Sequence, residues 1–137
     1  MYHDCRFDYT FRRIAQVAST GVNLITASLA NGQNAACWLV VSKNGKYAYT
    51  ANAGNGTVSS YAIGPSGSLS LVEPRAGTPG GHPIDEAISQ NGRFLYVLNT
   101  GAGALGINAF AVQPDGSLNL LGTTSGTPAS AAGLVAR

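Results

Sequence analysis

One stretch of this 137-residue sequence is written twice. GKYAYTANAGNG occupies residues 45–56, and GRFLYVLNTGAG occupies residues 92–103. When Ser42 is aligned with Ser89, the two copies match without gaps at an offset of 47, because 89 minus 42 is 47. A repeat of this period indicates an architecture in which each repeat is one supersecondary unit that must pack against its neighbours.

Each copy contains four segments with the pattern of a β-strand. In the first copy these are CWLVVS, KYAYTAN, TVSSYAI and SLSLV, and in the second RFLYVLN, INAFAV and SLNLL match the last three. An Asn-Gly pair between the first two segments predicts a two-residue hairpin with positive φ angles. TVSSYAI alternates polar and apolar residues, as does a strand with one face in solvent. Four antiparallel strands of this length form one blade of a β-propeller.

The sequence therefore predicts an all-β fold, a β-propeller fragment with two complete four-stranded antiparallel blades and parts of flanking blades. We expect the complete blades at 34–80 and 81–129. Residues 14–33 would be a partial blade with NLITASLA as its fourth strand, and 130–137 a single innermost strand. Residues 1–13 fit the pattern poorly and are expected to form an outer strand or a frayed tail. No apolar stripe of helical period is present, so we expect almost no helix.

Two blades share one interface and leave two broad sheet faces uncovered. These faces are larger than the apolar patches that a soluble monomer usually exposes. Propellers avoid this exposure by closing into rings of about four to eight blades. Either further blades precede this segment, or several copies of the chain complete the ring as a homo-oligomer.

Composition argues against several functional classes. Charged residues make up 10% of the chain and the net charge is +2, which cannot supply the dense cationic surface that nucleic acid requires. The longest apolar run, AACWLVV, is much shorter than the roughly 20 residues of a membrane-spanning helix. The N-terminus lacks the apolar core of a secretory signal, which makes the cytoplasm the default expectation.

Cysteine spacing and glycine patterns suggest no cofactor and no metal. Cys5 and Cys37 form no CxxC pair, so we expect two isolated, reduced thiols rather than a disulfide or a metal site. With His3 and His82 they also lack the close ligand pairs of a structural zinc site. GAGALG at 101–106 satisfies a dinucleotide-binding pattern, but a strand-like segment follows it where a helix is required.

The two copies also resemble a known family. NGQNAACWLVVSKNGKYAYTANAGNGTVSSYAI and PIDEAISQNGRFLYVLNTGAGALGINAFAVQPDGSL are similar to the seven-bladed lactonase-like β-propellers, which are related to YVTN-repeat propellers. That family includes bacterial 6-phosphogluconolactonases and fungal 3-carboxymuconate cyclases. The resemblance covers residues 14–137 and corresponds to the C-terminal third of such a protein. It implies a closed ring, a central channel and a substrate pocket at one mouth, with a sugar lactone or a small carboxylated muconate as substrate.

Candidate site residues lie where a propeller gathers its loops at one mouth of the channel. Asn52 and Asn99 end equivalent strands, and they would either bond their own tight loops or contact a substrate. Arg75 is a further candidate for substrate binding, or a partner for a nearby acid.

The segment GGHPIDEA holds the candidate catalytic residues His82, Asp85 and Glu86. In the alignment of the two copies, the two acids replace Trp38 and Leu39 on an innermost strand. A buried carboxylate there costs several kcal/mol, on the order of the desolvation penalty, unless it is paired.

A histidine with two carboxylates could perform general acid–base chemistry on a lactone or an enol. Arg75, Arg93, His82 or channel water could neutralise the acids. Alternatively, these groups cap the strand start and are hydrated by the channel. Without the rest of the ring we expect the chain to be inactive. The competing hypothesis is a non-enzymatic β-propeller repeat module that binds a protein or ligand.

Overall fold

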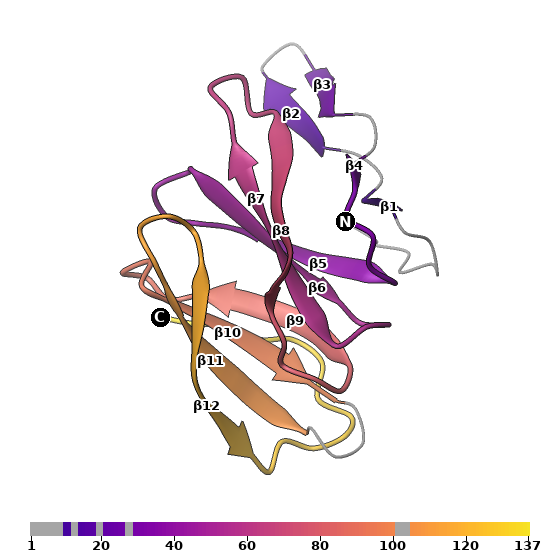
Figure 1. Ribbon diagram of the computed structural model, residues 1–137, viewed down its shortest axis with the longest axis vertical. Coiled ribbons are helices and arrows are strands. Elements are labelled where there is room, and N and C mark those ends of the chain that lie inside the picture. Colours follow the sequence, from indigo (N-terminus) through magenta and orange to yellow (C-terminus); the bar gives the residue numbers. More distant parts are fainter. Residues whose placement is uncertain (1–9, 12–13, 19–20, 27–28, 101–104) are drawn as a thin grey trace.

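The structure of the protein is a computed structural model that describes residues 10–11, 14–18, 21–26, 29–100 and 105–137 (Figure 1). Every regular element in these ranges is a β-strand. None of the described residues forms a helix of the length and apolarity needed to cross a membrane. The predicted all-β class is confirmed.

Two four-stranded antiparallel sheets make up most of the molecule. In the first, which we call blade 1, the spatial order follows the chain: β5 (Ala36–Val41), β6 (Tyr47–Asn52), β7 (Thr57–Ile63) and β8 (Leu69–Gly77). Blade 2 repeats this order: β9 (Pro83–Ile88), β10 (Phe94–Asn99), β11 (Gly106–Val112) and β12 (Leu118–Ser125). The predicted pair of complete blades is therefore present, although the exact domain boundaries stay a prediction.

The turn between the first two strands of each blade is longer than predicted. In blade 1 the Ser42 N–H donates to the Tyr47 carbonyl oxygen, so residues 43–46 form a four-residue loop rather than a two-residue hairpin, and the Gly45 N–H donates to the Ser42 carbonyl oxygen within it. Gly45 has a positive φ of 68°, whereas Asn44 is not among the residues with positive φ. Instead, the Asn44 side-chain oxygen accepts hydrogen bonds from the Ser42 hydroxyl and the Lys46 N–H. The repeated Ser-x-Asn-Gly sequence is thus explained by a side-chain-stabilised turn.

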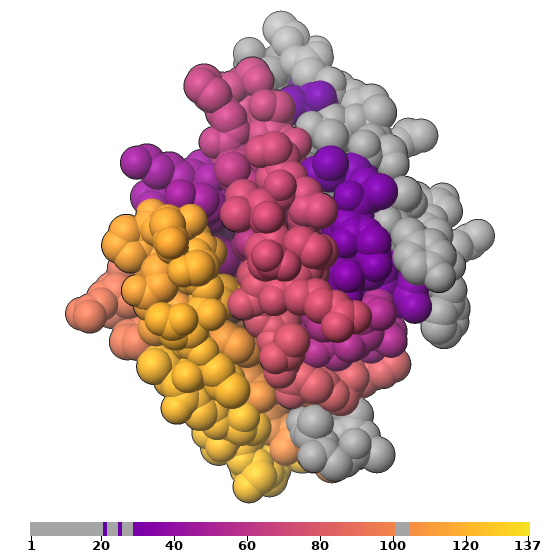
Figure 2. Space-filling view, in the orientation of Figure 1, coloured from indigo at the N-terminus to yellow at the C-terminus, as the bar shows by residue number. Residues whose placement is uncertain are grey.

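The main core lies between the two blades. Its fully buried members come from both sheets: Tyr49, Val58, Ile88, Leu95, Val97 and Phe110. Strand β9 of blade 2 packs against β5 and β6 of blade 1, and the outer strands β8 and β12 lie side by side on one face of the molecule (Figure 2). The blades therefore stack face to face as separate sheets, and burial of these apolar side chains is the main force that joins them.

The N-terminal part forms two short pairs. Strand β2 (Ile14–Ala18) pairs with β3 (Gly21–Thr26), and β1 (Thr10–Phe11) pairs with β4 (Leu29–Ala30). The prediction that NLITASLA forms one strand is wrong, because its two halves pair with different partners. Apart from β1, the region predicted as an outer strand or tail lies outside the described residues.

The C-terminal segment is not a strand. Residues 126–137 contain no regular element, so the predicted innermost strand AAGLVA is wrong. A strand requires a neighbour for its backbone hydrogen bonds, and no strand of a further blade is described here. Instead, the Leu134 N–H donates to a carboxylate oxygen of Asp85, which brings the segment onto β9.

Cys37 on β5 is disulfide-bonded. The expectation of two reduced thiols is therefore wrong for this residue, and Cys5, the other cysteine, lies outside the described residues. Cysteine spacing along the chain is a poor guide to disulfide formation, because it does not give the distance between residues in space.

Candidate functional site

The loops expected to form the channel mouth do gather at one edge of each blade. In blade 1 the Ala53 N–H donates to the Ala35 carbonyl oxygen at 3.0 Å. In blade 2 the equivalent bond runs from the Thr100 N–H to the His82 carbonyl oxygen at 3.1 Å. Each bond ties the end of a second strand to the loop that enters the innermost strand. The edge that carries these bonds is called the loop edge below.

Asn52 is fully buried at the loop edge of blade 1, within a network of polar side chains. Its amide donates to the Thr57 hydroxyl at 3.1 Å and to the Ser59 hydroxyl at 2.9 Å. Its side-chain oxygen accepts a 2.9 Å bond from the amide of Asn31, which also reaches the Tyr61 hydroxyl at 3.0 Å. Both amide hydrogens of Asn52 are therefore already used within this network, and its side-chain oxygen also has a partner there.

Asn99 occupies the equivalent position in blade 2 and is also fully buried. Its side-chain oxygen accepts a 2.6 Å bond from the His82 N–H. Its amide donates to the carbonyl oxygens of Pro79 and Gly80 at 3.2 and 2.5 Å. Asn99 thus holds the backbone of the neighbouring loop that carries His82 rather than its own tight loop, and a contact with substrate stays a prediction.

Asp85 and Glu86 leave β9 on opposite faces, because successive side chains of a strand alternate. Asp85 is 3% exposed and lies beneath the C-terminal segment, where its carboxylate accepts hydrogen bonds from the Leu134 and Glu86 N–H groups. Burial raises the pKa of Asp85, and these two bonds oppose that effect.

Glu86 points the other way, into the interface between the blades. It is 2% exposed, and neither carboxyl oxygen has a hydrogen-bond partner. Loss of hydration raises the pKa of Glu86 well above its usual value, and the Asp85 carboxylate raises it further. The N–H groups of Ala51 and Val40 lower the pKa, although neither meets hydrogen-bond geometry with the carboxyl oxygens. Burial without a hydrogen-bond partner therefore favours the neutral form of Glu86 over the charged one.

His82 and Arg75 are both exposed, and they lie on different parts of the blade. His82 is in the loop before β9, while Arg75 is on β8, the outermost strand of blade 1. The Arg75 N–H donates to the Glu73 carboxylate at 3.1 Å. Within the described ranges, no cation influences the pKa of Asp85 or Glu86. The charge partners considered from the sequence do not reach the two acids.

The six predicted site residues are thus not brought together on one surface. His82 and Asn99 are adjacent, but the two acids face different interiors and Asn52 belongs to the other blade. The buried network around Asn31 was not predicted, because its only sequence signal is an Asn-Gly pair that is also typical of an ordinary turn. Over the same described ranges, no three His, Cys, Asp or Glu side chains are grouped so that they could hold a metal ion.

No family model matches the sequence, and no curated protein matches it significantly. Among solved structures, the chain is similar to a protein of Bacteroides uniformis to which 6-phosphogluconolactonase activity is ascribed, with 26% identity and a TM-score of 0.66. It is also similar to the periplasmic gluconolactonase PpgL of Pseudomonas aeruginosa, with 25% identity and a TM-score of 0.58. A protein from Lactobacillus plantarum shares the fold at 23% identity and a TM-score of 0.67.

These matches cover 77%, 80% and 82% of this chain, respectively. They cover only 31%, 30% and 35% of the matched structures, so the chain spans about a third of their length. The matches agree with the two stacked four-stranded sheets and with the family that the sequence resembles. The fold of this chain is that of the lactonase-like β-propellers.

Proposed function

We propose that this chain supplies two adjacent blades of a lactonase-type propeller and is inactive without the remaining blades. The observation that carries the proposal is the divergence of the three candidate catalytic side chains. His82 is exposed at the loop edge, Asp85 is covered by the C-terminal segment, and Glu86 is sealed between the blades. Lactone hydrolysis requires an activated water and a group that polarises the carbonyl, and these residues do not face one common space.

In the complete ring, the loop edge would form part of the channel mouth and His82 would be its ionisable contact with the substrate. The substrate class that we propose is a sugar lactone, with a muconate-type carboxylated molecule as the other family chemistry. Support comes from the activities named for two of the similar structures. Asp85 and Glu86 would then have structural roles on β9. The low charge of the chain argues against a nucleic-acid or membrane partner.

A proton-release assay tests this proposal, because lactone hydrolysis liberates an acid. The 137-residue chain is mixed with glucono-lactone and with 6-phosphoglucono-lactone, and the rate is compared with spontaneous hydrolysis. We expect no acceleration by the chain or by its His82→Ala variant. Acceleration that His82→Ala abolishes would contradict inactivity of the chain alone. Acceleration that survives both His82→Ala and the Asp85→Asn/Glu86→Gln double variant would also refute the site residues.

The second candidate is a non-enzymatic module that binds a partner through an open blade face. The observation in its favour is that the outer strands carry exposed large apolar side chains: Val72 at 51%, Leu120 at 55% and Leu121 at 59%. Light scattering separates the outcomes for the isolated chain. A homo-oligomer that Leu120→Ser/Leu121→Ser dissociates would mean that copies of the chain bind one another through this surface. A stable monomer at all concentrations would exclude self-assembly into a ring.

A further inference from the structure

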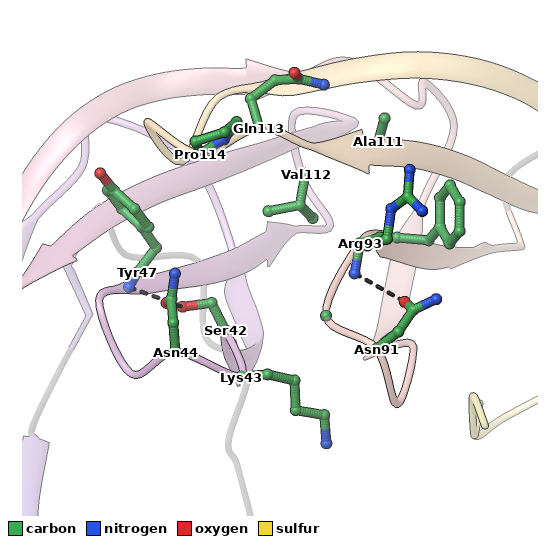
Figure 3. A pocket seen from close by; sticks show the side chains of 12 residues that line it. Ser42, Lys43, Asn44, Tyr47, Asn91, Arg93, Ala111, Val112, Gln113 and Pro114 are labelled. Carbon is green, nitrogen blue, oxygen red and sulfur yellow. Dashed lines mark hydrogen bonds between the residues drawn. The ribbon is translucent and has the colours of Figure 1, made fainter.

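A pocket of about 460 Å³ lies at the edge of the blades opposite the loop edge (Figure 3). Because neighbouring strands run antiparallel, the turns after β5, β9 and β11 all project at this second edge. Two equivalent turns from the two blades form its walls, and the end of β11 forms its roof. Its volume is within the range of small-molecule sites. No residue proposed for the lactonase chemistry lines it.

The lining of this pocket carries two positive charges and no acid. Lys43 comes from the turn after β5, and Arg93 comes from the equivalent turn after β9. The nearest acid along the chain is Asp115, whose carboxylate is turned toward its own loop and accepts bonds from the Ser117 N–H and hydroxyl. The pocket therefore has a positive electrostatic character within a chain of low overall charge.

Two asparagine amides add hydrogen-bond donors. The side-chain oxygen of Asn44 is occupied by the Ser42 hydroxyl and the Lys46 N–H, and that of Asn91 by the Ser89 hydroxyl and the Arg93 N–H. These bonds occupy the oxygen of each amide and fix its orientation, so that only its NH₂ group remains available for further hydrogen bonds. Neither NH₂ group has a hydrogen bond among the described residues, which leaves both able to donate to a ligand.

Both cationic side chains are exposed, and each has one neighbour against which it packs. The carbon stem of Lys43 crosses Gly92 so closely that an added Cβ at residue 92 would meet the Lys43 Cβ at 3.0 Å and Cγ at 3.1 Å. The guanidinium carbon of Arg93 lies 5.9 Å from the centroid of the Phe94 ring, within cation–π range. In Figure 3, the carbon stem of Lys43 runs from the first turn toward the second, which carries Asn91 and Arg93, while the Lys43 amine and the Arg93 guanidinium extend to opposite sides of the view.

We propose that this pocket binds a small organic anion through its carboxylate or phosphate group. Lys43 and Arg93 supply the charge, and the amides of Asn44 and Asn91 supply directional donors. Charge-assisted hydrogen bonds to an oxyanion are roughly twice as strong as neutral ones. The site would exist in the two-blade unit itself, because every lining residue belongs to blade 1 or blade 2. It is therefore independent of ring closure and of the proposed hydrolysis.

The test is a titration of the isotope-labelled chain with citrate, with inorganic pyrophosphate and with sodium chloride at matched ionic strength, followed by amide NMR shifts. We expect saturable shifts at residues 42–47, 91–94 and 111–114 with a dissociation constant of about 1 mM or tighter. The Lys43→Gln/Arg93→Gln variant keeps both side-chain stems and should weaken binding about tenfold or more. Lys46→Gln/Arg75→Gln removes the same charge from residues that do not line the pocket and serves as the matched control.

Two results would overturn the proposal. One is the absence of saturable shifts with both anions, and the other is an equal loss of affinity in the pocket and control variants, which would indicate unspecific attraction. Citrate binding without pyrophosphate binding would assign the site to carboxylates, and the reverse to phosphates. Circular dichroism of each variant shows whether the fold is kept, and shifts confined to the loop edge would instead place the anion at the lactonase-type site.

Discussion

The Tyr49 hydroxyl donates a 3.0 Å hydrogen bond to the carbonyl oxygen of Gly116. Tyr49 lies on β6 of blade 1, whereas Gly116 lies in the turn between β11 and β12 of blade 2. The bond is therefore a direct polar link between two separate sheets. Burial raises the pKa of Tyr49 to about 12, so the hydroxyl keeps its proton at any ordinary pH.

Tyr49→Phe removes this link while keeping the ring in the core. We expect it to lower the free energy of unfolding by about 0.5–1.5 kcal/mol, because the Gly116 carbonyl loses its partner. Tyr47→Phe is the matched control, since the Tyr47 hydroxyl has no hydrogen bond among the described residues. Urea denaturation measures both. Equal effects in the two variants would mean that the bond between the blades contributes nothing.

Glu86 predicts a specific dependence of stability on pH. Because its pKa is raised in the folded protein above 4.5, the folded state holds the proton more tightly than the unfolded chain. Its contribution is complete below pH 4.5 and is lost as the pH rises toward the folded-state value. Glu86→Gln should therefore reduce the loss of stability as the pH rises above 4.5 toward the folded-state pKa of Glu86.

Asp115→Asn is the control for this experiment, because the exposed Asp115 has a lowered pKa from its bonds to Ser117. Its contribution is present above pH 3.8 and is lost as the pH falls further, so it leaves the profile above pH 5 unchanged. An unaltered profile in Glu86→Gln would show that Glu86 is ionised and solvated in the folded protein.

Replacement of Asn99 by alanine should lower the free energy of unfolding more than replacement of an exposed asparagine does. Asn99→Ala leaves the His82 N–H and the Pro79 and Gly80 carbonyl oxygens without their partner. We expect a loss of about 2–3 kcal/mol in the free energy of unfolding. Asn119→Ala, at an exposed position on β12, should change it by less than about 0.5 kcal/mol. Thermal unfolding that ranks the two variants the other way would refute the loop-holding role of Asn99.

The disulfide of Cys37 is open to chemical test. In the denatured but unreduced chain we expect Cys37 to resist alkylation, and after reduction to react fully. Mass spectrometry of the peptide that contains Cys37 gives the answer. A disulfide persists mainly in oxidising compartments, so its presence would count against the cytoplasmic default. Full alkylation without reductant would mean that Cys37 is a reduced thiol, as predicted from the sequence.

The blades were predictable because their signal is local and repeated. Strand alternation and the Asn-Gly turns depend on near neighbours in the chain. The offset of 47 between Ser42 and Ser89 shows that the same local pattern occurs twice. The short strand at Leu29 and the irregular segment around Leu134 were not, because the conformation of each depends on which distant strand is available to pair with it. Prediction from local sequence pattern is expected to fail at these two places, because distant strands decide their conformation.

The candidate site was less predictable for a related reason. The sequence located Asp85 and Glu86 correctly on an innermost strand, and alternation alone implies that they face opposite sides. It could not reveal what covers each side, since the C-terminal segment over Asp85 and the blade interface around Glu86 are both long-range features. The same holds for the anion pocket, which Lys43 and Arg93 both line only because the blades stack.

Cross-strand NOEs between α-protons test the stacking of two separate blades most directly. We expect contacts of β6 with β5 and β7, contacts of β10 with β9 and β11, and side-chain contacts of Tyr49 with the turn at Gly116. Backbone pairing of residues 45–56 with residues 92–103 in one continuous sheet would contradict it.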